Sequence, residues 1–121
     1  MAALTAKIDM SHWPAAVVAL KGEANTGQDM AEVIETLLWV RGRNPQRLII
    51  DMSNMGGRPQ AIARKALAEH LTEHWSGIPI PFVCASPLLR GAVTAMQWVM
   101  AAAPSPPDIK ICVSTNDALS V

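Results

Sequence analysis

The sequence predicts a single α/β domain, in which about five strands form a mixed, mostly parallel sheet with helices mainly on one face. Short apolar runs alternate with longer segments of helical periodicity, in the order β-β-α-β-α-β-α-β. A length of 121 residues and a hydrophobic content of 50% suffice for one buried core, so we expect one domain over residues 1–121. Three helices are too few to cover both faces of such a sheet evenly.

The first half of the chain is expected to form three strands and one helix. Residues 4–10 alternate loosely in polarity, and residues 15–20 are almost continuously apolar, so both predict strands. Residues 30–40 predict a helix, because their apolar side chains fall on one stripe. That stripe comprises Met30, Val33, Ile34, Leu37 and Val40. Residues 47–51 predict a third strand, followed by a glycine-containing loop and by Pro59, which suits the first position of a helix.

The second half alternates helix and strand twice. We expect a helix over residues 61–75, a strand over 78–85, a helix over 88–103 and a last strand over 109–115, followed by a short terminal segment. Ser86 is expected to cap the second of these helices and Pro87 to open it. The core stripe of that helix is predicted to comprise Leu89, Ala92, Val93, Met96, Val99 and Met100.

Composition excludes several classes of function. Ten basic and ten acidic residues give a formal net charge of zero, so we expect neither a nucleic-acid partner nor a polybasic membrane patch. Prolines interrupt the longest uncharged stretch, residues 91–107, so we expect no membrane-spanning segment. Cys84 and Cys112 lie in strand-like runs and are expected to be small buried hydrophobes. With no secretion signal and no nucleotide-binding motif, we expect a cytoplasmic protein without a cofactor.

Three short segments resemble the STAS, or SpoIIAA-like, family, which includes anti-sigma-factor antagonists of bacteria. They are AVVALKGEA at residues 16–24, LIIDMSNM at 48–55 and IKICVSTNDAL at 109–119. The resemblance implies the SpoIIAA-like fold and a noncatalytic protein-interaction or regulatory role. Signalling members of the family carry a phosphorylatable Ser or Thr at the start of the helix after the central strand. Here that segment reads GGRPQA at residues 56–61, and Ser53 lies before it, so we expect a member without this phosphoacceptor.

Polar residues follow the strands at the edge where open α/β sheets bind ligands. Two helices are predicted to begin at this rim, and their free amides suit an anion such as a phosphate or carboxylate. The candidate ligand-binding residues are Asp51, Ser53, Asn54, Gly56, Gly57, Arg58, Ser86 and Arg90. The alternative is that these residues only cap helices and form turns.

Tryptophans outside the predicted core stripes indicate a protein interface, because Trp is a favoured anchor at such surfaces. Trp98 lies with small residues on a second apolar flank of the last long helix. Trp39 falls opposite the core stripe of its helix, and Trp75 lies off the centre of its own. The interface candidates are Trp39, Gly91, Ala95, Trp98 and Ala102. They favour a protein partner or a homo-oligomer; the alternative is that a neighbouring element covers Trp98.

Two further functions stay open as alternatives. The first is a small-ligand or lipid carrier, in which the helix around Met96 and Met100 moves to admit a guest. The second is a metallohydrolase, since His70, Glu73 and His74 match the H-x-x-E-H pattern. No third ligand motif follows, and the two histidines share a stripe with alanine and leucine residues. A partly buried, hydrogen-bonded pair of histidines is therefore the preferred interpretation.

Overall fold

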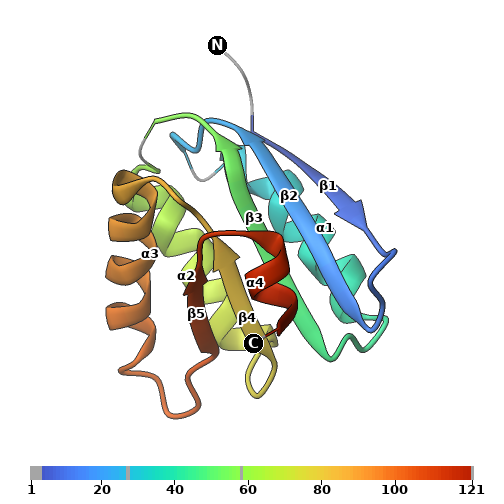
Figure 1. Cartoon of the computed structure of the whole chain (residues 1–121). Helices are drawn as coiled ribbons and strands as arrows, with labels where there is room; N and C mark the ends of the chain where they lie inside the picture. The colour runs from blue at the N-terminus through green and yellow to red at the C-terminus, as the bar shows by residue number, and fades with distance from the viewer. Residues whose placement is uncertain (1–3, 27, 58, 121) are drawn as a thin grey trace.

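The computed structural model describes residues 4–26, 28–57 and 59–120. Within these residues, five strands, four α-helices and one 3₁₀ helix alternate as Figure 1 shows. They are β1 (Thr5–Asp9), β2 (Ala15–Gly22), η1 (Gln28–Met30), α1 (Ala31–Arg41), β3 (Arg47–Met55), α2 (Ala61–His74), β4 (Pro79–Val83), α3 (Pro87–Met100), β5 (Asp108–Cys112) and α4 (Thr115–Ser120). This order confirms the sequence prediction, and the terminal segment forms α4.

The strands lie side by side in the order in which they occur in the sequence, β1-β2-β3-β4-β5. The pair β1–β2 is antiparallel, and every later pair is parallel. Each parallel connection steps to the next strand in the same direction, so right-handed crossovers place α1, α2 and α3 on one face. Figure 1 shows these three helices behind the sheet and α4 in front of it. The predicted mixed sheet with helices mainly on one face is confirmed.

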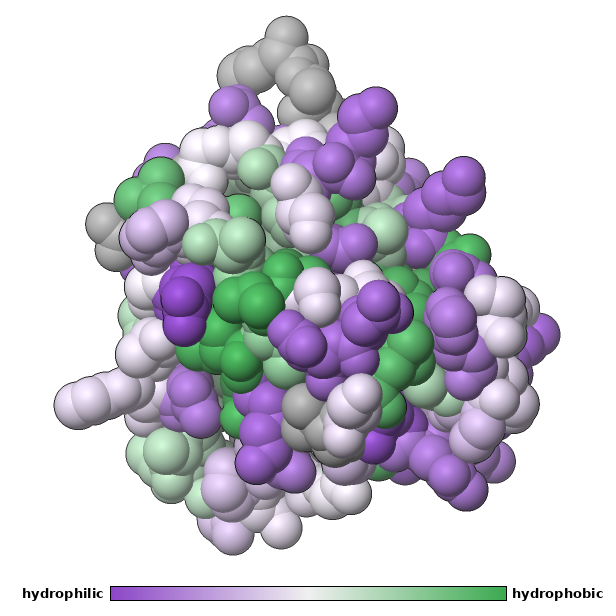
Figure 2. All heavy atoms as spheres, in the orientation of Figure 1, coloured by the Kyte–Doolittle hydropathy of each residue, from purple (hydrophilic) through white to green (hydrophobic). Residues whose placement is uncertain are grey.

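Two hydrophobic cores lie on the two faces of the sheet. The larger core is formed where alternate strand residues, such as Val18, Ile50 and Phe82, meet the stripes of α1, α2 and α3. The smaller core lies under α4 and comprises Ala15, Val17, Ile49, Val83, Cys112 and Ala118. In Figure 2, hydrophobic side chains are visible in the middle of this second face, because α4 is too short to cover it fully.

The two cysteines lie on opposite faces of neighbouring strands. Cys84 belongs to the larger core and Cys112 to the smaller one, and both are buried. A disulfide needs Cβ atoms that point toward each other, so this placement does not allow one. Burial raises the pKa of both thiols. The prediction of small buried hydrophobes is confirmed.

Strand β3 is longer than predicted. The sequence indicated a loop after Asp51, yet Ser53 and Asn54 belong to the strand, which ends at Met55. The reason is a bulge in β3, where Met52 and Ser53 lie opposite the single residue Leu20 of β2. After the bulge Lys21 pairs with Asn54, and the ladder continues for one more residue. The polar segment is therefore held by backbone pairing, which its side chains do not reveal.

Two predicted details at the starts of α2 and α3, the roles of Pro59 and Ser86, are wrong. Helix α2 begins at Ala61 rather than at Pro59, because Gln60 is extended and its N–H donates to the carbonyl of Ala24 at 2.9 Å. Ser86 precedes α3 as predicted, but its side chain makes no capping hydrogen bond. Pro87 is the first residue of the helix, in agreement with the sequence.

Candidate interaction surface

The outer flank of α3 carries the most exposed large hydrophobic residues of the described chain. Trp98 is 79% exposed and Val99 is 70% exposed. The other candidates on this helix, Gly91 and Ala95, and Ala102 just beyond its end, are exposed as well. The predicted core position of Val99 is wrong: it lies about 80° from the centre of the buried stripe at 100° per residue. The structure turns it outward, beside α2.

A surface groove of about 870 Å³ lies between α2 and α3. Its α3 side is entirely apolar, whereas its α2 side is mostly polar or charged. The α3 side comprises Ala95, Met96, Val99, Met100, Ala102 and Ala103. The α2 side comprises Ala61, Arg64, Lys65, Ala68, Glu69, Thr72 and Glu73. The structure thus brings the candidates Ala95 and Ala102 to the same groove and leaves Trp98 exposed on the helix that forms its apolar side.

The charges on α2 are ordered along the helix. Arg64 and Lys65 lie in its first half, and Glu69 and Glu73 lie in its second half. Lys65 Nζ is 3.9 Å from Glu69 Oε1, but both side chains are largely exposed, so this ion pair contributes little to stability. Arg64 Nη1 donates to the carbonyl of Pro59 at 2.6 Å. One end of the groove is therefore basic and the other acidic.

Trp39 does not join this surface. It lies on α1, and α2 separates α1 from α3 in the helical layer (Figure 1). The guanidinium carbon of Arg43 lies 3.4 Å from the centroid of the Trp39 ring, so a cation–π contact covers one face of the indole. With 45% of its surface exposed, Trp39 is much less accessible than Trp98.

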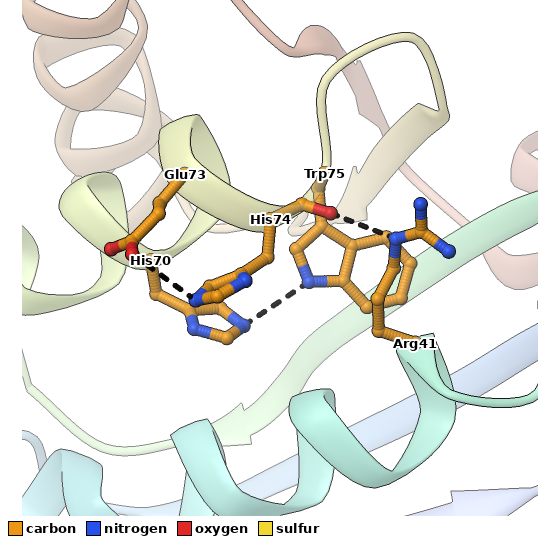
Figure 3. Close-up of polar contacts among 5 residues, drawn as sticks. All are labelled: Arg41, His70, Glu73, His74 and Trp75. Carbon is orange, nitrogen blue, oxygen red and sulfur yellow. Dashed lines mark hydrogen bonds and ion pairs between the residues drawn. The ribbon is translucent and has the colours of Figure 1, made fainter.

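Trp75 is fully buried, although the sequence places it off the centre of the apolar stripe of its helix. Its indole Nε1 donates a hydrogen bond to Nε2 of His70 at 3.1 Å (Figure 3). Arg41 of α1 lies on the other side of the indole, with its guanidinium carbon 5.9 Å from the ring centroid, and its Nε donates to the carbonyl of His74 at 2.8 Å. These contacts join the end of α2 to α1, and a buried indole is tolerated because its N–H has a partner.

His70 is held neutral by its surroundings. Its pKa is lowered to about 4, mainly by burial and also by the neighbouring His74, while Glu73 partly opposes both effects. Because Trp75 only donates, the Nε2 atom of His70 is the unprotonated nitrogen, and its lone pair is already used. Within the H-x-x-E-H segment, His70 thus makes a buried structural contact, whereas His74 is half-buried and Glu73 is exposed. In the part of the chain that the structure describes, no three His, Cys, Asp or Glu side chains are grouped to hold a metal ion.

Three residues predicted at the rim do come together. Ser53, Gly57 and Ser86 line a cavity of about 220 Å³ between the end of β3 and the start of α3. The carboxylate of Asp51 is occupied within its own strand, because its Oδ1 accepts hydrogen bonds from N and Oγ of Ser53 at 2.9 and 2.6 Å. The other candidates there, Asn54, Gly56 and Arg90, are exposed, and Arg58 lies outside the described residues.

Two features of the rim oppose an anion. A Cβ atom placed on Gly57 would lie 3.7 Å from Oε1 of Glu23, so a carboxylate borders the glycine turn, and that of Asp51 lies nearby in β3. Moreover, the ligand crevice of open α/β sheets forms where the strand order reverses, and the order β1-β2-β3-β4-β5 contains no reversal. A ligand site at the rim stays a prediction.

Both edges of the sheet are partly blocked by helix side chains. On β1, the N–H of Ala6 donates to Oε2 of Glu32 from α1 at 2.8 Å. On β5, Gln97 of α3 donates to the carbonyl of Ile109 at 3.4 Å. Unpaired edge groups are the usual template for adding a strand from another chain. Because these edge groups are occupied, strand addition is disfavoured at both edges, and the helical face is the better candidate for a binding surface.

The interior leaves little room for a guest. Beneath α3, around Met96, the structure holds an apolar cavity of about 20 Å³, whereas ligand pockets measure about 300–1,000 Å³. A carrier function would therefore require α3 to move or the guest to lie in the open groove. Among the residues described, no helix is long and apolar enough to cross a membrane.

A five-stranded sheet in chain order, with one antiparallel pair and three helices on one face, defines the architecture of a STAS/SpoIIAA-like domain. The chain is similar to an anti-sigma factor antagonist from Mycobacterium paratuberculosis, with 18% identity, a TM-score of 0.67 and coverage of 97% of this chain and 92% of that one. It is also similar to an uncharacterized protein of the DUF3478 family with a SpoIIAA-like fold from Shewanella loihica, with 14% identity, a TM-score of 0.57 and coverage of 99% and 93%.

These two likenesses confirm the STAS/SpoIIAA-like fold that the sequence predicted. At such low identities they show the fold alone. No protein-family model matches the sequence, and no curated protein matches it.

Proposed function

We propose that the chain is a noncatalytic, regulatory module of the bacterial cytoplasm that binds a protein partner through the groove between α2 and α3. One observation carries this proposal: the 870 Å³ groove has an apolar α3 side, and the helix that forms it also bears Trp98, which is 79% exposed. Large exposed apolar side chains beside a groove are typical of protein-binding sites. The shared fold with an anti-sigma factor antagonist is consistent with such a role.

The groups that suit catalysis are engaged in structural contacts, which supports binding over chemistry. His70 accepts a hydrogen bond from the indole of Trp75, and Asp51 accepts two from Ser53. Burial raises the pKa of the Cys84 thiol, which disfavours the reactive thiolate. These residues stabilise the fold and leave the exposed helical face for recognition.

Site-specific photocrosslinking in the source cell tests the proposal. A photoreactive residue placed at Val99, in the groove, is expected to capture a defined protein, and the purified captured protein is expected to bind saturably. Lys110 is the matched control, because it is exposed on β5 and alternates with buried Ile109, so it faces away from α2 and α3. The adduct should disappear with Trp98→Ala. Equal labelling at both positions, or no protein adduct at Val99, would contradict the proposal.

A further inference from the structure

We infer that the occupant of the α2–α3 groove is a second copy of this chain, in a two-fold symmetric dimer whose α2 helices run antiparallel. This inference rests on the proposed function and names the partner of the same surface. It follows from the order of charges on α2, the uncharged outer stripe of α3 and the blocked edges of the sheet.

The charges of α2 complement themselves only in the antiparallel arrangement. Its first half carries Arg64 and Lys65, and its second half carries Glu69 and Glu73. A two-fold axis near the middle of α2 brings the basic half of one copy to the acidic half of the other, whereas a parallel arrangement would bring like charges together. A different protein would match this order of charges only by coincidence, whereas a second copy of the chain matches it by symmetry. The zero formal net charge also removes long-range repulsion between copies.

The outer stripe of α3 supplies the apolar contact. Residues 91–103 contain no charged side chain, and Trp98 and Val99 are exposed among small residues. A Cβ atom added to Gly91 would meet no heavy atom within 4 Å, so another backbone can approach this side of the helix closely. In an isologous interface each patch is used twice, so the dimer covers both copies of Trp98.

A dimer needs only a small part of the surface of this chain. A stable interface buries about 800 Å² on each partner, about one-eighth of the 6352 Å² total. Dimerisation through a sheet edge is disfavoured, because Glu32 of α1 occupies an edge group of β1 and Gln97 of α3 occupies one of β5.

Sedimentation velocity at several concentrations, with the full chain, tests the inference. The wild-type chain is expected to dimerise reversibly, and Trp98→Ala is expected to raise the dimer Kd at least about tenfold, as for a central interface tryptophan. Trp39→Ala is the matched control, since it removes a partly exposed tryptophan from α1 and should leave the Kd unchanged. Thermal unfolding checks that each variant remains folded.

Charge reversal separates a second copy from any other occupant. Lys65→Glu and Glu69→Lys each place like charges across the two-fold axis, so each variant alone should dimerise more weakly by about threefold or more. A mixture of the two variants restores opposite charges and should recover dimers. Both positions are exposed, so folding is retained.

The outcomes decide between the two proposals. A monomeric wild type, a dimer insensitive to Trp98→Ala, or no recovery on mixing would each overturn the two-fold dimer. If the wild type is monomeric but Val99 still captures another protein in the cell, the binding module stands and only its partner was wrongly assigned. If nothing is captured and no dimer forms, both proposals fail.

Discussion

Acidification is expected to destabilise the fold through one buried side chain, His70. This residue is 6% exposed and, as a neutral imidazole, accepts the hydrogen bond from Trp75. Protonation would remove that acceptor and place a charge beside His74, whose ring centroid lies 4.8 Å away. Glu73 is the neighbouring group that favours the charged form, and its effect is smaller than those of burial and His74.

The magnitude follows from the two pKa values of His70. Folding lowers the pKa from 6.5 to about 4, mainly because burial disfavours the charged imidazole. Below pH 6.5, His70 of the unfolded chain binds a proton, whereas His70 of the folded chain binds one only near pH 4. The contribution is therefore fully present above pH 6.5, declines as the pH falls through this window and is lost below it. The total change is about 3 kcal/mol, and about 2 kcal/mol is already lost at pH 5.

Urea denaturation over a pH series checks this prediction with His70→Gln as the comparison. The glutamine carbonyl can accept from the indole of Trp75 but does not titrate, so the variant should lose about 3 kcal/mol less than the wild type on acidification. Carboxylates titrate in both proteins and cancel in the difference. His12, which is exposed, provides the control His12→Gln, expected to follow the wild type. Parallel stability curves for wild type and His70→Gln would refute the reasoning.

Four further outcomes follow from exposure, packing and edge protection. Trp98→Ala should change the unfolding free energy measured in urea by less than about 0.5 kcal/mol, because the ring is 79% exposed; a larger loss would show that it packs within the monomer. Gly91→Ala should raise that free energy by about 0.5–1 kcal/mol, since the added methyl enters open space on a helix. Gln97→Ala should increase light scattering during prolonged incubation, because it frees a carbonyl on edge strand β5. Cys84 and Cys112 should react with a thiol reagent only under unfolding conditions; labelling at native rates typical of free thiols would contradict their burial.

The elements of the fold were predictable where side chains report contact with a core. The apolar run at residues 15–20 became β2, and the stripe containing Val33, Leu37 and Val40 became the buried face of α1. These patterns are visible in sequence because burial selects hydrophobic residues at the period of the element. The one-sided arrangement followed from counting helices and from the handedness of parallel crossovers.

Features that depend on a distant partner were not predictable from local pattern. The polar end of β3 is a strand because Lys21 of β2 pairs with Asn54. Trp75 lies off the centre of its helical stripe in the sequence. It is nevertheless buried, because His70 accepts a hydrogen bond from its N–H and Arg41 of α1 packs over its ring. The sequence places Val99 in the core stripe of α3. Helix α2 does not cover this side of α3, so Val99 is exposed. In each case a residue elsewhere in the chain decides burial.

The candidate surface was only half visible in the sequence for the same reason. The sequence of α3 alone shows the uncharged flank that bears Trp98. Lys65 and Glu69 of α2, in contrast, form a pattern that is typical of any solvent-exposed helix face. The strand order joins them: since β3, β4 and β5 follow one another without reversal, α2 and α3 must lie side by side on one face. The same order contains no reversal of the kind that forms a ligand crevice in open α/β sheets. The same topology thus creates the groove between α2 and α3, through which we propose that the chain binds its partner.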